Sequence, residues 1–181
     1  MGSMCEGRIT SDLRDRDGVV VFLIGMRVNR PWEFWRWVPV LAAMPRMLVE
    51  LMQDPSRGLL GRPRTFVSGR VIMVVQYWKS FEDLERYARD PHGQHLPAWR
   101  TFNRRVRDNR AVGIFHETYR VAASDAETVY VNMPVFGLAE ATAAVPVRGG
   151  SQTAAARLGV RPLDVSPVEL EDSNHKEGAL R

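Results

Sequence analysis

The sequence predicts an α+β fold of the ferredoxin-like type, in which a strand, a helix, two strands, a helix pair and a last strand follow one another. The first observation is that residues 19–28 and 71–78 are apolar at both alternating sets of positions, as in strands covered on both faces. The second is that the segments after them carry apolar side chains at helical spacing. The helices of one such unit cover only one sheet face, so the other face needs a second sheet. The sequence therefore predicts a homodimer, a dimeric α+β barrel.

Proline and turn-forming residues decide where the first helix and the loop after it are expected. Residues 32–52 are apolar at helical spacing, but Pro39 and Pro45 lie inside the segment and predict a kink or two short helices. Residues 54–64 are rich in turn-forming residues and predict a loop, which a short strand at residues 65–69 follows.

Helix-start chemistry marks the second helical region. Ser80, with Asp83 three positions later, resembles a capping box and predicts a helix that ends near Arg89. A further helix is expected over residues 94–108 and a strand over residues 112–121. These elements complete the βαββαβ order.

Composition divides the chain into three parts. Residues 1–17 are polar and charged and predict a flexible N-terminal arm, residues 18–147 form the α+β domain, and residues 148–181 predict a disordered C-terminal tail. A chain of 181 residues with 45% hydrophobic content suffices for one such domain.

Charge and cysteine content limit the partners. The net charge of +4 is spread along the chain, so no nucleic-acid partner is expected. The single cysteine, Cys5, excludes a disulfide within the chain and agrees with a cytoplasmic protein. No apolar run approaches ~20 residues, so no membrane partner is expected.

His95 occupies the start of the third predicted helix, where Pro97 fits the first turn. It heads an apolar stripe at offsets of four, seven and eleven, formed by Trp99, Phe102 and Val106. A single histidine on such a face is more often a hydrogen-bonded core residue than a ligand. A metal-binding role for His95 therefore needs support from the wider segment.

His116 belongs to the last predicted strand. Alternation places it on one face with Ile114 and Thr118, and places Glu117 and Tyr119 on the other face. The same caution applies to this histidine, because neither Glu117 nor Tyr119 can easily orient it. A helix start and a following strand can nevertheless bring two imidazoles towards one cavity.

Residues 77–121 carry a resemblance to a known family. They read YWKSFEDLERYARD, HLPAW and FHETYRV in order, followed by YVNM, and they resemble the C-terminal half of the haem-dependent aldoxime dehydratases. The resemblance implies that His95 is the axial ligand of a haem b and that His116 is the distal acid–base group. The domain as a whole resembles more closely a set of uncharacterised monooxygenase-like proteins of the dimeric α+β-barrel superfamily.

The haem hypothesis extends to further side chains. Apolar residues would line a flat cavity for the macrocycle, and Trp99, Phe102 and Met73 are the residues expected there. The propionates would need cations, for which the candidates are Arg100, Arg104, Arg105 and Arg27. Aldoxime dehydratases carry two fused ferredoxin-like halves, whereas this chain carries one, so haem binding carries over better than the reaction itself.

Three functions stay open at this point. The leading hypothesis is a haem-dependent enzyme that acts on a small organic substrate, an aldoxime or another N–O compound. The second is a cofactor-free monooxygenase or isomerase of the same fold, in which Trp35, Tyr77 and Trp99 would line the pocket for an aromatic substrate. The third is a non-catalytic small-molecule-binding protein.

Overall fold

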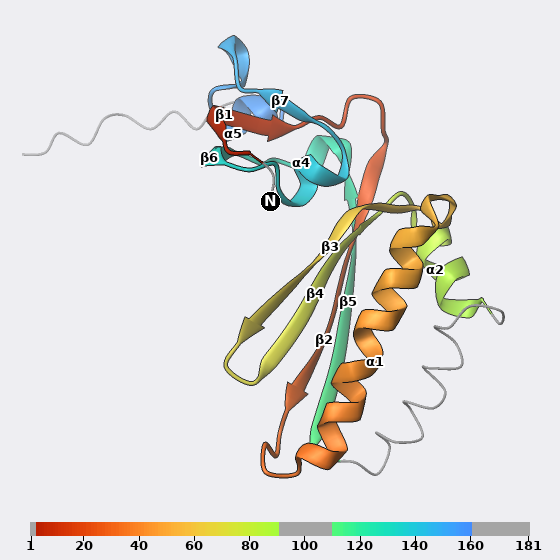
Figure 1. The fold of residues 1–181 in the computed structure, drawn as a ribbon. Coiled ribbons are helices and arrows are strands. Elements are labelled where there is room, and N and C mark those ends of the chain that lie inside the picture. Colours follow the sequence, from red (N-terminus) through yellow and green to blue (C-terminus); the bar gives the residue numbers. More distant parts are fainter. Residues whose placement is uncertain (1–2, 91–109, 161–181) are drawn as a thin grey trace, which may run out of the picture.

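The computed structural model describes residues 3–90 and 110–160, which form two antiparallel sheets and their helices (Figure 1). The larger sheet consists of β2 (Gly18–Val28), β3 (Leu59–Ser68), β4 (Val71–Trp78) and β5 (Val112–Ala122). Its strand order is β3-β4-β2-β5. Helix α1 follows β2 and helix α2 follows β4, so the predicted α+β ferredoxin-like fold is confirmed.

Strand β2 lies inside the sheet and sets its register. It pairs antiparallel with β4 from Val20 to Arg27 and with β5 along its whole length. Because side chains alternate along a strand, each residue of β2 fixes the face on which its partners in β4 and β5 lie.

Helices α1 (Phe34–Gln53) and α2 (Phe81–Arg89) pack on one face of this sheet, which we call the helix face. Two buried clusters join them to it. One is formed by Val20, Leu51, Trp78, Leu84 and Tyr87, and the other by Met26, Val28, Val40 and Val112. Burial of these side chains holds the helices to the sheet.

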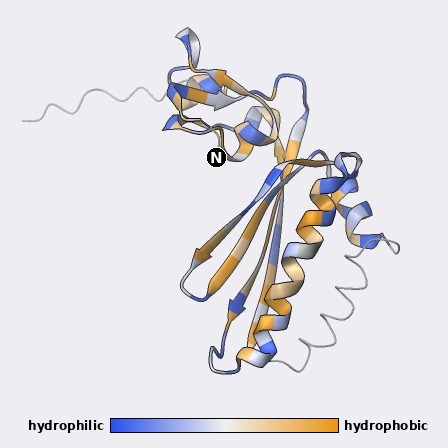
Figure 2. Ribbon diagram, in the orientation of Figure 1, coloured by the Kyte–Doolittle hydropathy of each residue, from blue (hydrophilic) through white to orange (hydrophobic). Residues whose placement is uncertain are grey.

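Helix α1 is one continuous helix of 20 residues, although Pro39 and Pro45 lie inside it. The alternative of two short helices is therefore wrong. Each proline removes a hydrogen bond and costs about 3 kcal/mol or more in a helix interior. Packing of the apolar helix against the sheet offsets this cost, and Figure 2 shows apolar residues along the length of α1.

Helix α2 begins where the sequence predicts. The Ser80 side chain accepts a hydrogen bond from the Asp83 backbone N–H at 3.1 Å, and the helix ends at Arg89. This cap satisfies one of the backbone donors that a helix start leaves free.

Strand β3 begins at Leu59, within the segment expected to be a loop. Its pairing with β4 shifts between Leu60 and Arg64, which face Tyr77 and Val75. Gly61 lies in this bulge at φ +62°, and a Cβ there would lie 2.9 Å from Cα of Ala141. The bulge therefore fits a glycine on two counts.

The smaller sheet corrects the expectation for the N-terminus. Strand β1 (Cys5–Ser11) pairs with β6 (Tyr130–Met133) on one side and with β7 (Ala144–Pro146) on the other. Cys5–Ser11 is therefore a central strand, not part of an unstructured arm. Its partners lie far along the chain, so the local pattern of polar residues could not reveal the pairing.

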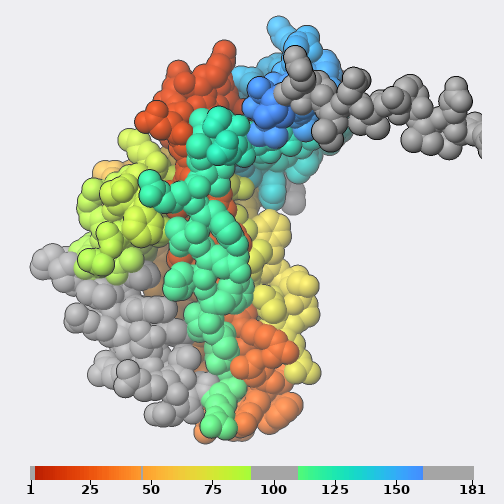
Figure 3. All heavy atoms as spheres, turned by 180° about the vertical axis from the view of Figure 1, so that it is seen from behind, coloured from red at the N-terminus to blue at the C-terminus, as the bar shows by residue number. Residues whose placement is uncertain are grey.

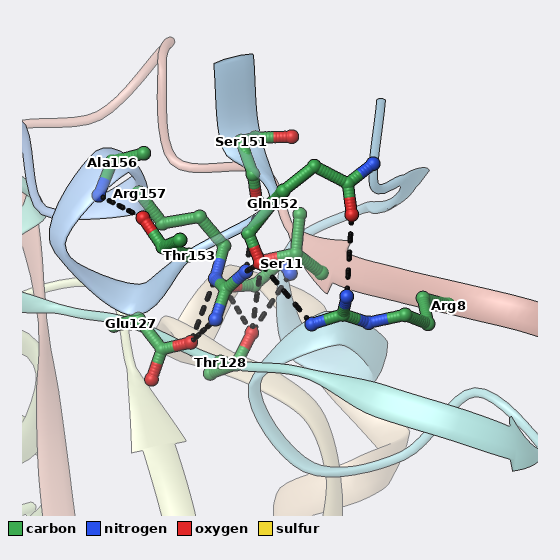
Figure 4. A network of polar contacts seen from close by, with 10 residues as sticks. Arg8, Ser11, Glu127, Thr128, Ser151, Gln152, Thr153, Ala156 and Arg157 are labelled. Carbon is green, nitrogen blue, oxygen red and sulfur yellow. Dashed lines mark hydrogen bonds and ion pairs between the residues drawn. The ribbon is translucent and has the colours of Figure 1, made fainter. Parts of the chain in front are cut away.

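Part of the segment expected to be disordered is also structured. It contains the 3-10 turn η3 (Gly149–Ser151) and helix α5 (Ala154–Arg157), followed by residues up to Val160. The Arg157 side chain is nearly buried, and its Nε donates to Glu127 Oε1 at 2.7 Å (Figure 4). This network attaches α5 to the segment before β6.

The face of the larger sheet opposite the helix face, which we call the outer face, is only partly covered. Helix α4 (Gly137–Ala141) and Leu13 pack over one end of it, against Val19, Tyr77 and their neighbours. The rest carries apolar side chains that are half-buried or exposed, namely Val21, Leu23, Phe66, Met73, Val75 and Phe115. In the described part of the chain this surface therefore lacks a full cover.

Candidate functional site

A cavity of about 280 Å³ lies between the helix face of the sheet and helices α1 and α2. Its wall is mostly apolar. The sheet contributes Phe22, Ile24, Gln76, Trp78, His116 and Thr118, α1 contributes Met44, Met47, Leu48 and Leu51, and α2 contributes Phe81, Leu84, Glu85, Tyr87 and Ala88. Ligand sites are typically of this kind, apolar with a few placed polar groups.

His116 faces this cavity from the edge strand β5. It pairs with Ile24 of β2, and its ring centroid lies 6.0 Å from that of Phe22. The residue is exposed to solvent. His116 therefore stands at the rim of the cavity, where it can contact both a bound molecule and water.

Glu117 and Tyr119 lie on the outer face, as alternation requires. The Tyr119 hydroxyl donates to Glu117 Oε2 at 2.5 Å, and this hydrogen bond raises the pKa of Tyr119 above its ordinary value. Because the sheet separates them from the cavity, neither residue can contact a molecule bound beside His116.

Gln76 is a site residue that the motif analysis missed. It lies on the helix face at the centre of the sheet and is only 6% exposed. The Trp78 indole Nε1–H donates to Gln76 Oε1 at 2.9 Å. The signal that could have found it is one amide in a strand face whose other members, Ile72, Val74 and Trp78, are apolar.

Tyr87 closes the cavity on the α2 side. Its ring lies 5.6 Å from that of Trp78, and its hydroxyl donates to the backbone carbonyl of Met47 at 3.4 Å. Burial, followed by the charge of Glu50, raises the pKa of Tyr87 to about 12. The guanidinium of Arg57 lies 5.4 Å from the ring centroid. Tyr87 is therefore a protonated wall residue at neutral pH, not a base.

Most residues of the haem hypothesis cannot be placed beside His116. His95, Trp99, Phe102 and Arg100 lie outside the described residues. Met73 pairs with Gly25 and shares the outer face with Val75, on the side of the sheet opposite His116. The expectation that Met73 contacts the same ligand as His116 is therefore wrong.

The residues expected in the pocket of a cofactor-free enzyme are also distributed differently. Trp35 is 60% exposed near the start of α1 and stacks edge-on against Phe34. Tyr77 packs on the outer face with Leu138. Trp78 and Tyr87 line the cavity in their place.

Residues 3–90 and 110–160 contain no group of three or more histidine, cysteine, aspartate or glutamate side chains placed to hold a metal ion. They also contain no helix long and apolar enough to cross a bilayer.

The fold and the cavity define a class, the ferredoxin-like α+β domains with a cavity between the sheet and its helices. Within it, the chain belongs to the Monooxygenase af470-like family, whose model matches residues 19–138. Monooxygenase af470 of Aspergillus fumigatus is 27% identical over 151 residues, which cover 73% of this chain and 53% of that protein. The chain thus spans about half the length of this curated relative.

Two solved structures share the fold. An aldoxime dehydratase in complex with butyraldoxime matches with a TM-score of 0.58 and 18% identity, over 74% of this chain and 42% of that chain. A second aldoxime dehydratase matches with a TM-score of 0.59 and 17% identity, over 78% and 43%. The resemblance to both families that the sequence predicts is therefore confirmed, and this chain matches less than half of each dehydratase.

The pKa of Tyr87 predicts how stability depends on alkaline pH. The unfolded side chain ionises near pH 10, whereas the folded one keeps its proton to about pH 12. Ionisation therefore favours the unfolded state between these values, and this part of the free energy of unfolding is lost as pH rises from 10 to 12. Urea unfolding across this window should show a smaller loss in Tyr87→Phe than in the unmodified chain. If the free energy of unfolding fell equally steeply with pH in both proteins, the raised pKa would not belong to Tyr87.

Proposed function

We propose that the protein is a monooxygenase-like enzyme that acts on a small, mostly apolar organic substrate in the cavity between the sheet, α1 and α2. The observation that carries the proposal is that His116 and the buried amide of Gln76 face the same apolar cavity. The family to which the chain belongs supports oxygen chemistry. The volume of about 280 Å³ suits a molecule of one or two rings.

His116 is the residue that we assign to proton transfer. It is the only histidine among the described residues, and imidazole exchanges protons readily near neutral pH. Tyr87 holds its proton too tightly, and Glu117 lies behind the sheet. General acid–base help of this kind contributes ~10²–10⁴-fold to a rate.

A phenol such as 1-naphthol has the required chemistry. Conversion by O2 to 1,4-naphthoquinone and water balances without an added reductant, because the substrate supplies all the electrons. One oxygen atom of O2 enters the ring and the other leaves as water. Loss of the phenol proton lets the ring carbon form a bond to O2. His116 would then take up the proton of that carbon as the O–O bond breaks and the second oxygen atom leaves as water.

The test uses 1-naphthol and related phenols in air-saturated buffer, with quinone formation followed by absorbance. His116→Ala should lower turnover by ~10²–10⁴-fold relative to the unmodified protein. Tyr119→Phe is the matched control on the outer face and should retain activity. Full activity of His116→Ala would show that another group moves the proton, and no turnover of any phenol would reject the substrate class.

We also propose that the protein is a homodimer joined through the outer face. Apolar residues of β2, β3 and β4 remain half-buried or exposed there, among them Phe66 at 43%. Contiguous apolar surface of this kind is uncommon on monomers. The aldoxime dehydratases that share the fold are more than twice as long as their match to this chain, so each has room for a second such unit.

Light scattering should therefore give about twice the chain mass at micromolar concentration. Val75→Asp places a charge on the outer face and should give a monomer or an aggregate. Val131→Asp is the control, because Val131 is exposed on the smaller sheet. A soluble monomer of the unmodified chain would overturn this proposal.

A second candidate function is a haem-dependent lyase that acts on an aldoxime or another N–O substrate. The fold shared with the aldoxime dehydratases and the position of His116 at the cavity favour it. Haem b would supply an iron that binds the substrate nitrogen.

The cavity bounded by the described residues, about 280 Å³, is small for a porphyrin together with its substrate, and the expected ligand His95 lies outside those residues. The described residues therefore do not form a haem pocket by themselves, and we assign no chemical step to iron.

Titration of the purified protein with haemin distinguishes the two candidates. Haem-dependent function predicts a shifted Soret band that His95→Ala loses and His116→Ala retains. Absence of a shift in the unmodified protein, or the same shift in His95→Ala, would reject His95 as the ligand. Loss of the band only in His116→Ala would mean that the roles of the two histidines are exchanged.

A further inference from the structure

The amide of Gln76 carries more information about the substrate than its burial alone. Its Oε1 accepts the Trp78 indole N–H at 2.9 Å, and indole nitrogen is a donor only. This contact therefore fixes the orientation of the amide, with the carbonyl oxygen on Trp78 and the NH2 group on the opposite side. Trp78 has no exposed surface, so the contact lies in the core.

The two N–H groups on Gln76 Nε2 are available to a ligand. The structure gives Gln76 one side-chain hydrogen bond, the one to Trp78, so its two N–H groups have no partner among the described residues. The residue is 6% exposed and lines the cavity. Nε2 is not among the described side-chain atoms that are fully buried without a partner, so it is accessible from the cavity. An apolar ligand that displaces water there leaves this donor unpaired, whereas a ligand with an acceptor satisfies it.

We propose, resting on the function proposed above, that the substrate carries a carbonyl or phenolic oxygen that accepts a hydrogen bond from Gln76 Nε2. Gln76 is thus a specificity-determining residue, and Trp78 positions it. Hydrocarbons that fill the cavity equally well leave the donor unpaired and bind less favourably for that reason.

The sheet register also places this oxygen relative to the proton-transfer group. Gln76 pairs with Phe22 of β2, which pairs with Thr118 of β5, and His116 lies two residues further along that strand. Strand spacing and rise put the Cα atoms of Gln76 and His116 roughly 12 Å apart. The two side chains and their hydrogen bonds occupy part of this distance and leave space for one ring above Phe22. The substrate oxygen and the reacting carbon therefore lie on opposite sides of a ring, as do C1 and C4 of 1-naphthol.

The test compares two ligands of the same skeleton, 1-tetralone with a carbonyl and tetralin with a methylene in its place. Dissociation constants are measured by calorimetry in the unmodified protein and in Gln76→Met. The ratio of the tetralin constant to the tetralone constant should fall by roughly tenfold in the variant. Gln53→Met, at the exposed end of α1, is the matched control and should keep the ratio.

Gln76→Glu separates recognition from a structural role. Its ionised carboxylate still accepts the Trp78 N–H but offers no donor to a ligand, so the variant should lose the preference for 1-tetralone at alkaline pH. Burial raises the pKa of such a carboxyl, and its protonated form at lower pH should regain part of the preference. A melting temperature that falls while the ratio stays unchanged would mean that Gln76 only supports Trp78, and would overturn the inference.

The infrared carbonyl stretch of bound 1-tetralone gives a second measurement on the unmodified protein. A hydrogen-bonded carbonyl absorbs at lower frequency than the same ketone in an apolar solvent, and Gln76→Met should remove that shift. A bound ketone with the apolar-solvent frequency would overturn the inference even if it binds tightly.

The binding measurements also separate the inference from the function proposed above. If neither 1-tetralone nor tetralin binds at its solubility limit, the cavity is not the ligand site, and the proposed function falls with the inference. If both ligands bind with an unchanged ratio, only the inference falls.

Discussion

The continuous pairing of β2 on both sides is the constraint on which the rest of the structure depends. Every residue of this strand has a partner in β5, and Val20–Arg27 also have partners in β4. The pairing with β2 therefore fixes which side chains of β4 and β5 point to the helix face and which point to the outer face. A shift of β4 by one residue would turn Gln76 and the core residue Trp78 to the outer face, and the same shift of β5 would turn His116 there.

A group of ion pairs around Arg57 joins the ends of helices α1 and α2. Arg57 lies in the turn after α1 and forms ion pairs with Glu50 at 3.6 Å, Asp54 at 3.1 Å and Asp90 at 3.4 Å. These carboxylates belong to the end of α1, to the turn itself and to the end of α2. Arg57 also lies over the ring of Tyr87. The cavity wall is thus braced by several charges around one guanidinium, an arrangement stronger than isolated surface pairs. Figure 3 shows α2 and β5 on the face of the molecule that is seen from behind.

Much of this fold could be predicted from local patterns, and the limits of the prediction have physical causes. The strands β2, β4 and β5 and the cap at Ser80 depend on residues that are neighbours in the sequence, so the local pattern predicts them. Strand β1 depends on partners more than 100 residues away, and its side chains are mainly polar. The face of Met73 does not follow from the sequence, because β4 is apolar on both faces and alternation does not say which face contacts the helices. Gln76 is visible in the sequence, but its meaning depends on the contact with Trp78.

The bulge in β3 has a consequence for how this chain can vary. Leu60 and Arg64 are four residues apart but face Tyr77 and Val75, which are two apart, so the strand holds two extra residues and keeps its parity. Loss or gain of a single residue there would turn Phe66 to the helix side and Thr65 to the outer side, whereas a change of two would not. Related chains should therefore differ in length at this point by even numbers. Because Gly61 also lies against Ala141 of α4, such changes would be accompanied by substitutions in that helix.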